Sequence, residues 1–167
     1  MIDVPDPIAA RPAEVGDAAE IVRLACVMFI SMGMPRPDEP WRRAASVHIA
    51  RRLGVDAIGA VVDHPTEPNH LIASAVATIS TRLPTPTNPT GRYGYIQWVA
   101  TDDDWRYKGC ARAVMTWLVA WFDDHAVSAL ELHATPMGER LYRSLGFWEG
   151  NGSPPLRRRT WDPAPPT

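Results

Sequence analysis

Apolar residues recur at helical spacing between residues 17 and 32, with polar residues on the opposite face. The apolar positions are Ala18, Ile21, Val22, Leu24, Ala25, Met28 and Phe29. They form one stripe of an α-helix, and Asp17 precedes them as a suitable N-cap. Prolines between residues 33 and 40 end this helix. The pattern further predicts a short strand over residues 8–11 and a second helix over residues 41–53.

The rest of the chain alternates between runs rich in β-branched residues and amphipathic stretches. Residues 55–62 and 71–81 are two such runs around a turn with proline and asparagine, so we expect a hairpin. Pro136 suits the first turn of a short helix, and Gly146 suits its C-terminal stop. The later elements are a strand over residues 93–101, a helix over 105–124, a strand over 129–134, a helix over 136–145 and closing strands at 147–148 and 156–161.

This order of elements predicts an α/β fold in which helices flank a mixed sheet. The chain has 167 residues, of which 46% are hydrophobic and 22% charged, and this is enough for one domain with a core. We expect that domain to span residues 8–161. A loose arm at residues 1–7 and a loose tail at residues 162–167 would flank it.

Charge and cysteine content exclude several classes of protein. The net charge of −2 gives no basic surface for nucleic acid, and the run at residues 157–159 is interpreted as a solvated strand end. Cys26 and Cys110 are the only cysteines, which favours a reducing cytoplasm over a disulfide framework. Neither a signal peptide nor a membrane span is expected. The scattered histidines predict no metal site.

The most informative segment is the turn before the helix expected at residues 105–124. Arg106-Tyr-Lys-Gly-Cys-Ala111 fits the pattern Arg/Gln-x-x-Gly-x-Gly/Ala. Gly109 has no Cβ, so a ligand can approach the backbone closely there. The N–H groups that open the helix have no helical partner and carry the positive end of its dipole. With Arg106, Lys108 and Arg112 around it, the turn suits a pyrophosphate.

This segment resembles the cofactor-binding motif of the GNAT family of acyl-CoA N-acyltransferases. Downstream, Gly138-Glu-Arg-Leu-Tyr-Arg-Ser-Leu-Gly-Phe147 is similar to the family's ending x-x-x-Leu-Tyr-x-x-Leu-Gly-Phe. Two motifs in the right order and at the right separation are more specific than either alone. The close match covers residues 93–150, whereas residues 8–81 match in element order. The resemblance implies a mixed, mainly antiparallel sheet with helices around it and a splayed central strand pair.

The resemblance also implies an acetyl-CoA-dependent N-acetyltransferase in which the amine attacks the thioester directly. The pantetheine arm would lie along Val99, Ala100 and Thr101. Thr135 stands where many members have an asparagine that contacts the arm. The pyrophosphate would be held by Arg106, Tyr107, Lys108, Gly109, Cys110, Ala111 and Arg112. The competing interpretation of this turn is a plain helix N-terminus on the surface.

Tyr142 aligns with the tyrosine that family members often use as general acid. A phenol is a suitable donor to a nascent thiolate, although a packing role would also explain an aromatic residue there. For the base, some members have a glutamate near the start of the cofactor strand, where Tyr95 stands here. His133, on the facing strand, is a second candidate because histidine ionises near neutral pH. Water relayed by backbone carbonyls is a third.

The acceptor that the resemblance implies is a primary amine of a small molecule or peptide, which the sequence does not identify. Two alternatives stay open, a non-catalytic acyl-CoA-binding module and a transferase for longer acyl chains. Because members of this family often form dimers, we expect a homodimer. Neither nucleic acid nor a membrane is expected as a partner.

Overall fold

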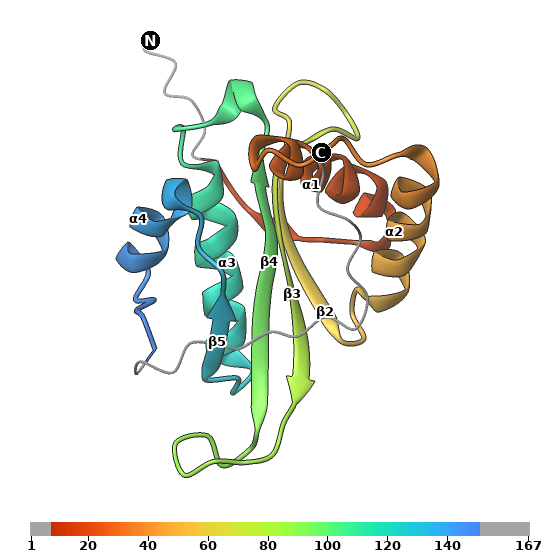
Figure 1. Ribbon diagram of the computed structural model, residues 1–167. Helices are drawn as coiled ribbons and strands as arrows, with labels where there is room; N and C mark the ends of the chain where they lie inside the picture. Colours follow the sequence, from red (N-terminus) through yellow and green to blue (C-terminus); the bar gives the residue numbers. More distant parts are fainter. Residues whose placement is uncertain (1–7, 151–167) are drawn as a thin grey trace. The chain divides into compact units, whose positions relative to one another are not determined.

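The computed structural model describes residues 8–150. They fall into two compact units, of which the first ends at His133 and the second begins at Ala134; each is described by itself. The first unit contains a five-stranded sheet in the order β1-β2-β3-β4-β5 with helices against it (Figure 1). Within residues 8–150, no helix has both the length and the apolar character that crossing a membrane requires.

The sheet is mainly antiparallel, as the family resemblance implied. Each strand pairs with the next in chain order, and only the pair between β4 and β5 is parallel. A parallel neighbour needs a crossover, which is the helix α3 (Cys110–Asp124). The strands are β1 (Arg11–Pro12), β2 (Ala57–Asp63), β3 (Leu71–Thr81), β4 (Arg92–Thr101) and β5 (Ala129–Leu132).

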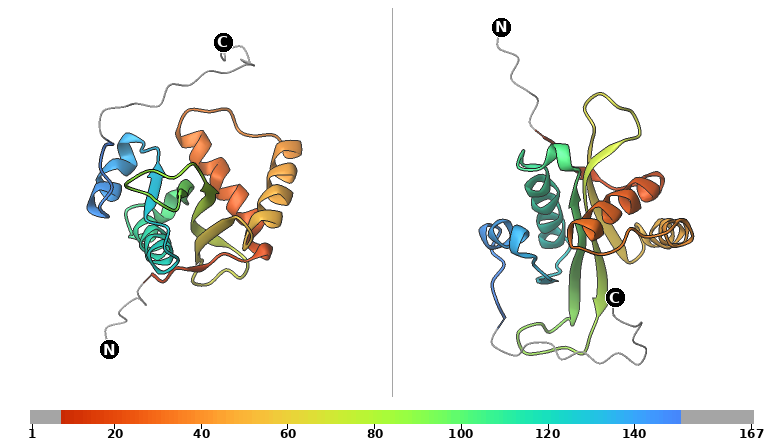
Figure 2. Two further views of the ribbon diagram at one scale, coloured as in Figure 1. Left: turned by 90° about the horizontal axis from the view of Figure 1, so that it is seen from below. Right: turned by 45° about the horizontal axis from the view of Figure 1, so that its top comes forward.

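Helices cover both faces of this sheet. The helices α1 (Ala18–Ser31) and α2 (Glu39–Arg52) lie on one face, and α3 lies on the other (Figure 2). Asp38 caps α2 by accepting a hydrogen bond from the N–H of Trp41 at 2.9 Å. Because β3 is covered on both sides, its residues 71–77 are buried without alternation.

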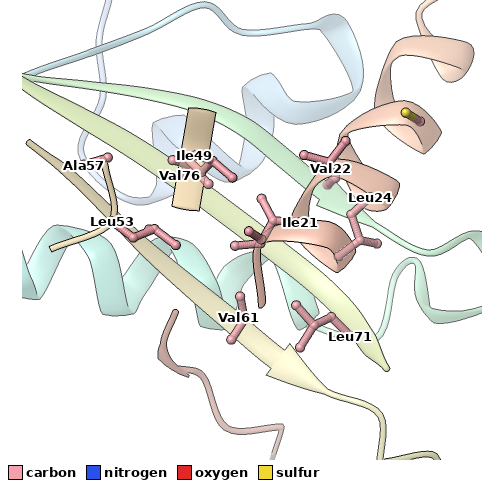
Figure 3. Packing of buried hydrophobic residues seen from close by; sticks show 12 residues of the cluster. Ile21, Val22, Leu24, Ile49, Leu53, Ala57, Val61, Leu71 and Val76 are labelled. Carbon is pink, nitrogen blue, oxygen red and sulfur yellow. The ribbon is translucent and has the colours of Figure 1, made fainter. Parts of the chain in front are cut away.

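The core between the sheet and α1 is built from aliphatic side chains (Figure 3). Ile21 and Leu24 of α1 are fully buried, and Val61 and Val76 of the strands pack in the same cluster. On the opposite face the buried residues of α3 are Val114, Met115, Leu118 and Phe122. A Cβ on Gly94 would lie 2.8 Å from the Phe122 ring. A glycine at this point of β4 therefore lets α3 pack directly on the strand.

Strands β4 and β5 separate halfway along β4. Their pairing runs from Tyr93–Ala129 to Ile96–Leu132, where β5 ends while β4 continues to Thr101. Just beyond the separation, the register with β3 shifts, because two residues of β4 lie opposite Ala75. This β-bulge holds Trp98 at φ 53°, in the left-handed region that bulges often use. The splayed strand pair thus carries a bulge at the point of divergence.

The structure corrects three details of the first unit. The helix expected from residue 105 begins at Cys110, because Tyr107 and Gly109 have φ of 61° and 92° and a right-handed helix cannot pass through them. A short 3-10 helix, η2 (Asp103–Trp105), precedes this turn. The first strand is β1, not residues 8–11. Asp17 is the N-cap residue of α1, as expected, but its carboxylate makes no capping hydrogen bond to the helix and instead accepts from Arg11.

The second unit contains α4 (Pro136–Ser144). Thr135 caps this helix through its hydroxyl, and Gly146 follows it at φ 89°, as a C-terminal glycine does. The strand expected at residues 147–148 is wrong, because these residues are in no strand. The strand expected at 156–161, the basic run 157–159, the arm 1–7 and the tail 162–167 lie outside the described residues.

Candidate functional site

The edge that β4 presents beyond β5 is the first part of the candidate site. Beyond Ile96, β4 has β3 as its one neighbouring strand within the described chain, paired through Gln97, Ala100 and Thr101. Their backbone groups on the other side are available to an extended ligand that carries amides, as in strand addition. Val99, Ala100 and Thr101 lie on this edge. The Oγ1 of Thr101 is buried and has no hydrogen-bond partner within residues 8–150.

The turn before α3 is the second part. Gly109 is the N-cap of α3, and its carbonyl accepts a hydrogen bond from the N–H of Ala113 at 3.0 Å. The N–H groups of Cys110 and Ala111 lie in the first helical turn, where no intrahelical acceptor exists. A Cβ on Gly109 would meet no atom within 4 Å, so the space beside the turn is open. An anion can therefore approach the start of this helix.

Basic and aromatic side chains surround the turn. Tyr107 is 94% exposed. Lys108 holds its ammonium group 4.8 Å from the centre of the Trp105 ring. Arg106 bonds to Asp103 at 2.9 Å, and Arg112 follows in the first turn of α3. The turn thus combines positive charge with a glycine-capped helix start.

Cys110 contributes backbone, not thiol chemistry, to this turn. The residue is 1% exposed, and burial raises the pKa of the thiol. A buried thiol with a raised pKa is a poor nucleophile, because the thiolate is the reactive form. This disfavours a covalent intermediate on Cys110 and agrees with direct attack on the thioester.

Tyr95 and His133 meet on the face of the sheet opposite α3. Tyr95 pairs with Glu131 across the parallel strands, and His133 follows β5. The Tyr95 Oη and the His133 Nδ1 lie 2.8 Å apart. The two residues that sequence reasoning nominated separately as candidate bases are therefore one hydrogen-bonded pair.

Sequence reasoning missed a second polar pair on this face. Arg82 donates to both carboxylate oxygens of Glu131, at 2.8 and 2.9 Å, and stands 4.2 Å above the Tyr93 ring. This hydrogen bonding lowers the pKa of Glu131. The sequence feature that could have indicated a polar residue here is the alternation of side chains along a strand, which puts Glu131 on the same face as His133.

The bulge residue Trp98 is surrounded by aromatic rings from two helices. Its ring centre lies 6.4 Å from Phe29 of α1 and 6.2 Å from Trp41 of α2, and those two rings are 5.8 Å apart. The two contacts of Phe29 are edge-on and that between Trp41 and Trp98 is tilted, and aromatic contacts of this kind are favourable beyond the area they bury. They hold Trp98 in the strained conformation that the bulge requires.

Tyr142 and Thr135 belong to the second unit. The Tyr142 ring lies over the first turn of α4, since a Cβ on Gly138 would come within 2.8 Å of it, and it stacks edge-on with Phe147 at 6.3 Å. Burial raises the pKa of the Tyr142 hydroxyl. The phenol therefore stays protonated at neutral pH, as a proton donor must. Thr135 acts as the helix cap.

Comparison with known families gives one clear match. The model of the acetyltransferase (GNAT) family matches residues 28–147. This segment includes the β4 edge, the turn, the Tyr95–His133 pair and all of α4. A comparison with curated proteins finds no significant match.

Solved structures share the fold at low identity. A predicted acetyltransferase with acetyl-CoA from Clostridium acetobutylicum is 24% identical, with a TM-score of 0.77, over 90% of this chain and 96% of that one. A GCN5-related N-acetyltransferase from Ralstonia eutropha is 24% identical, with a TM-score of 0.69, over 89% and 98%. Glucosamine-6-phosphate N-acetyltransferase from Arabidopsis thaliana is 16% identical, with a TM-score of 0.67, over 92% and 98%.

Proposed function

This chain belongs to the acetyltransferase (GNAT) family, and on that premise we propose that it transfers an acetyl group from acetyl-CoA to a primary amine. The acceptor is a small molecule or a peptide. One observation carries the proposal most strongly: the open, glycine-capped start of α3 is the next α-helix start after the strand whose edge is freed by the end of β5, with only η2 and a short turn between them. An anion site beside an unpaired backbone edge suits a long cofactor with phosphates at one end and amides along its arm.

We propose that the two parts of the site divide the cofactor between them. The pantetheine arm lies along Val99, Ala100 and Thr101 and pairs with their backbone. The pyrophosphate lies on the N–H groups around Gly109 and Cys110. Side chains and backbone of Arg106, Tyr107, Lys108, Ala111 and Arg112 complete the phosphate site, and Thr135 contacts the arm.

The chemistry then needs a base and an acid. The amine nitrogen attacks the thioester carbonyl, a tetrahedral intermediate forms, and the C–S bond breaks to release coenzyme A. We assign removal of the amine proton to the Tyr95–His133 pair, because a tyrosine hydroxyl that donates to an imidazole nitrogen keeps lone pairs that can accept from an amine. We assign protonation of the departing thiolate to Tyr142, whose raised pKa keeps the proton available.

A measurement of coenzyme A release tests the proposal. The protein is mixed with acetyl-CoA and a panel of aliphatic, aromatic and peptide amines, and free thiol is followed over time. Release that depends on one class of amine supports the transferase. Tight binding of acetyl-CoA without release across the panel would favour a non-catalytic acyl-CoA-binding module, and faster release from longer acyl-CoAs would identify a different donor.

We also propose a cytoplasmic location and a homodimer. Both cysteines are free thiols, which suits a reducing compartment, and family members often dimerise. Sedimentation at high micromolar concentration tests the second point. A single species of 18.5 kDa would contradict the dimer.

A further inference from the structure

Asp102, between β4 and η2, is anchored to the first helix of the chain. Its carboxylate accepts two hydrogen bonds from the guanidinium of Arg23 in α1, at 2.8 and 3.0 Å. Its N–H donates to the carbonyl of Ile72 at 2.9 Å, and its own carbonyl accepts from the N–H of Trp105 at 2.9 Å. Asp102 thus joins the end of β4, the start of η2 and a helix residue 79 positions away.

Arg23 is itself fixed by further bonds. It donates to the carbonyl of Leu71 at 2.7 Å and to both carboxylate oxygens of Glu20, at 2.9 and 3.0 Å. His70 stands between the two carboxylates, 3.3 Å from each. Glu20, Arg23, His70 and Asp102 are called the Asp102 cluster. The Asp102 side chain is 17% exposed and that of Arg23 is 34% exposed, so solvent screens this pair less than a surface pair.

A chain of ring contacts leads from the Asp102 cluster to the phosphate turn. The ring of His70 lies 5.4 Å from that of His64, and His64 lies 5.4 Å from Trp105. Lys108 completes the path, with its ammonium group over the Trp105 ring. The turn that follows contains Tyr107, whose φ of 61° lies in the left-handed region. In a residue other than glycine, such a conformation persists only when the surrounding structure determines it.

We propose that Arg23 is a positioning residue for acetyl-CoA, which acts by holding Asp102 and thereby the turn from Arg106 to Gly109. This inference rests on the proposed function. Arg23 needs no contact with the cofactor, because its ion pair fixes where η2 begins and the turn follows from there. A turn that is ordered before binding loses little further entropy when the phosphates arrive.

Calorimetry of the unmodified protein and three variants with coenzyme A tests the role of Arg23. Arg23→Gln removes the charge and the paired hydrogen bonds. The matched control is Arg52→Gln, because Arg52 makes a similar two-bond pair with Asp56 at 2.9 and 2.7 Å, remote from the turn. We expect Arg23→Gln to weaken binding about tenfold, the scale of ordering one or two side chains. Arg52→Gln should bind like the unmodified protein, and Arg23→Lys should recover part of the loss.

Thiol labelling separates positioning from general stability. Cys110 and Cys26 are both buried, the first at the turn and the second in α1. In the ligand-free protein, Arg23→Gln should speed the modification of Cys110, measured by mass spectrometry, and leave that of Cys26 unchanged. Equal acceleration at both cysteines would show a merely structural role and overturn the inference. Asp102→Asn repeats both measurements should Arg23→Gln fold poorly.

The outcomes distinguish the inference from the proposed function. If the unmodified protein does not bind coenzyme A, the proposed function fails, whereas the labelling still reports on the turn. If the unmodified protein binds and Arg23→Gln binds equally well, the inference is wrong and the function stands.

Discussion

The hydroxyl oxygen of Tyr95 lies 2.8 Å from Nδ1 of His133, across the one parallel pairing in the described sheet. The pair stands where β4 and β5 begin to separate, next to the edge proposed to hold the thioester arm. Some members of the family use a carboxylate as the base, and neither of these two residues has one. We propose that together they accept the proton of the attacking amine.

Replacing His133 by Gln should reduce the acetylation rate by about ten- to a thousandfold, the range expected when a general base is lost. The loss should shrink as pH rises, because a larger fraction of the amine is then neutral before it attacks, and hydroxide in the solvent can take the proton that it loses on attack. Rates with an identified acceptor between pH 6 and 10 measure this, and coenzyme A affinity should not change. A loss that stays constant with pH would contradict the role as base.

Gly109→Glu should abolish coenzyme A binding, because a carboxylate at the helix start repels the pyrophosphate and fills the space beside it. The matched control is Gly54→Glu. Gly54 has φ 79° and, like Gly109, has open space where a Cβ would stand, with no atom within 4 Å. Both variants therefore carry a similar backbone strain of about 1–2 kcal/mol. Calorimetry should show loss of binding in the Gly109 variant alone, and equal loss in both would assign the effect to strain.

Tyr142→Phe keeps the ring that packs on Gly138 and Phe147 and removes the hydroxyl. The fold and the acetyl-CoA affinity should survive, while the turnover number falls by about one to three orders of magnitude. Since the pKa of Tyr142 is raised by burial, the acid stays protonated and active to a higher pH than an ordinary tyrosine. Turnover at the unmodified rate, with chemistry rate-limiting, would make Tyr142 a packing residue.

Glu131→Gln should lower stability modestly at neutral pH, by at most about 1 kcal/mol, because the pair with Arg82 is solvent-exposed. Arg82 lowers the pKa of Glu131, so the pair stabilises the fold at pH values above the ordinary glutamate range. This contribution is lost as pH falls through the lowered pKa. Thermal unfolding of both proteins at pH 7 and pH 3 measures this, and the difference should be smaller at the lower pH.

The parts of the site that could be predicted are those that depend on residues close together in the sequence. The glycine turn and the stripe of α3 are contiguous, so their spacing alone indicated a helix start with open amides. The late start of α3 was missed because Tyr107 adopts a left-handed backbone and, unlike glycine, a tyrosine gives no sign of it. The Arg23–Asp102 pair was missed for another reason. Strand and helix periodicity indicate which face of its own element a residue lies on. They do not indicate which two elements pack against each other, and this decides whether two distant residues meet.

The bulge at Trp98 makes the site depend on residue count as well as residue type. Between Gln97 and Ala100, β4 has one residue more than β3, and such an extra residue bends the strand and increases its twist. Deleting that residue would restore regular pairing and leave Ala100 and Thr101 opposite Ser74 and Ala73. The sheet would lose little, yet the cofactor edge would lose the bend with which it begins. A change in chain length at this point is therefore more damaging than most substitutions there.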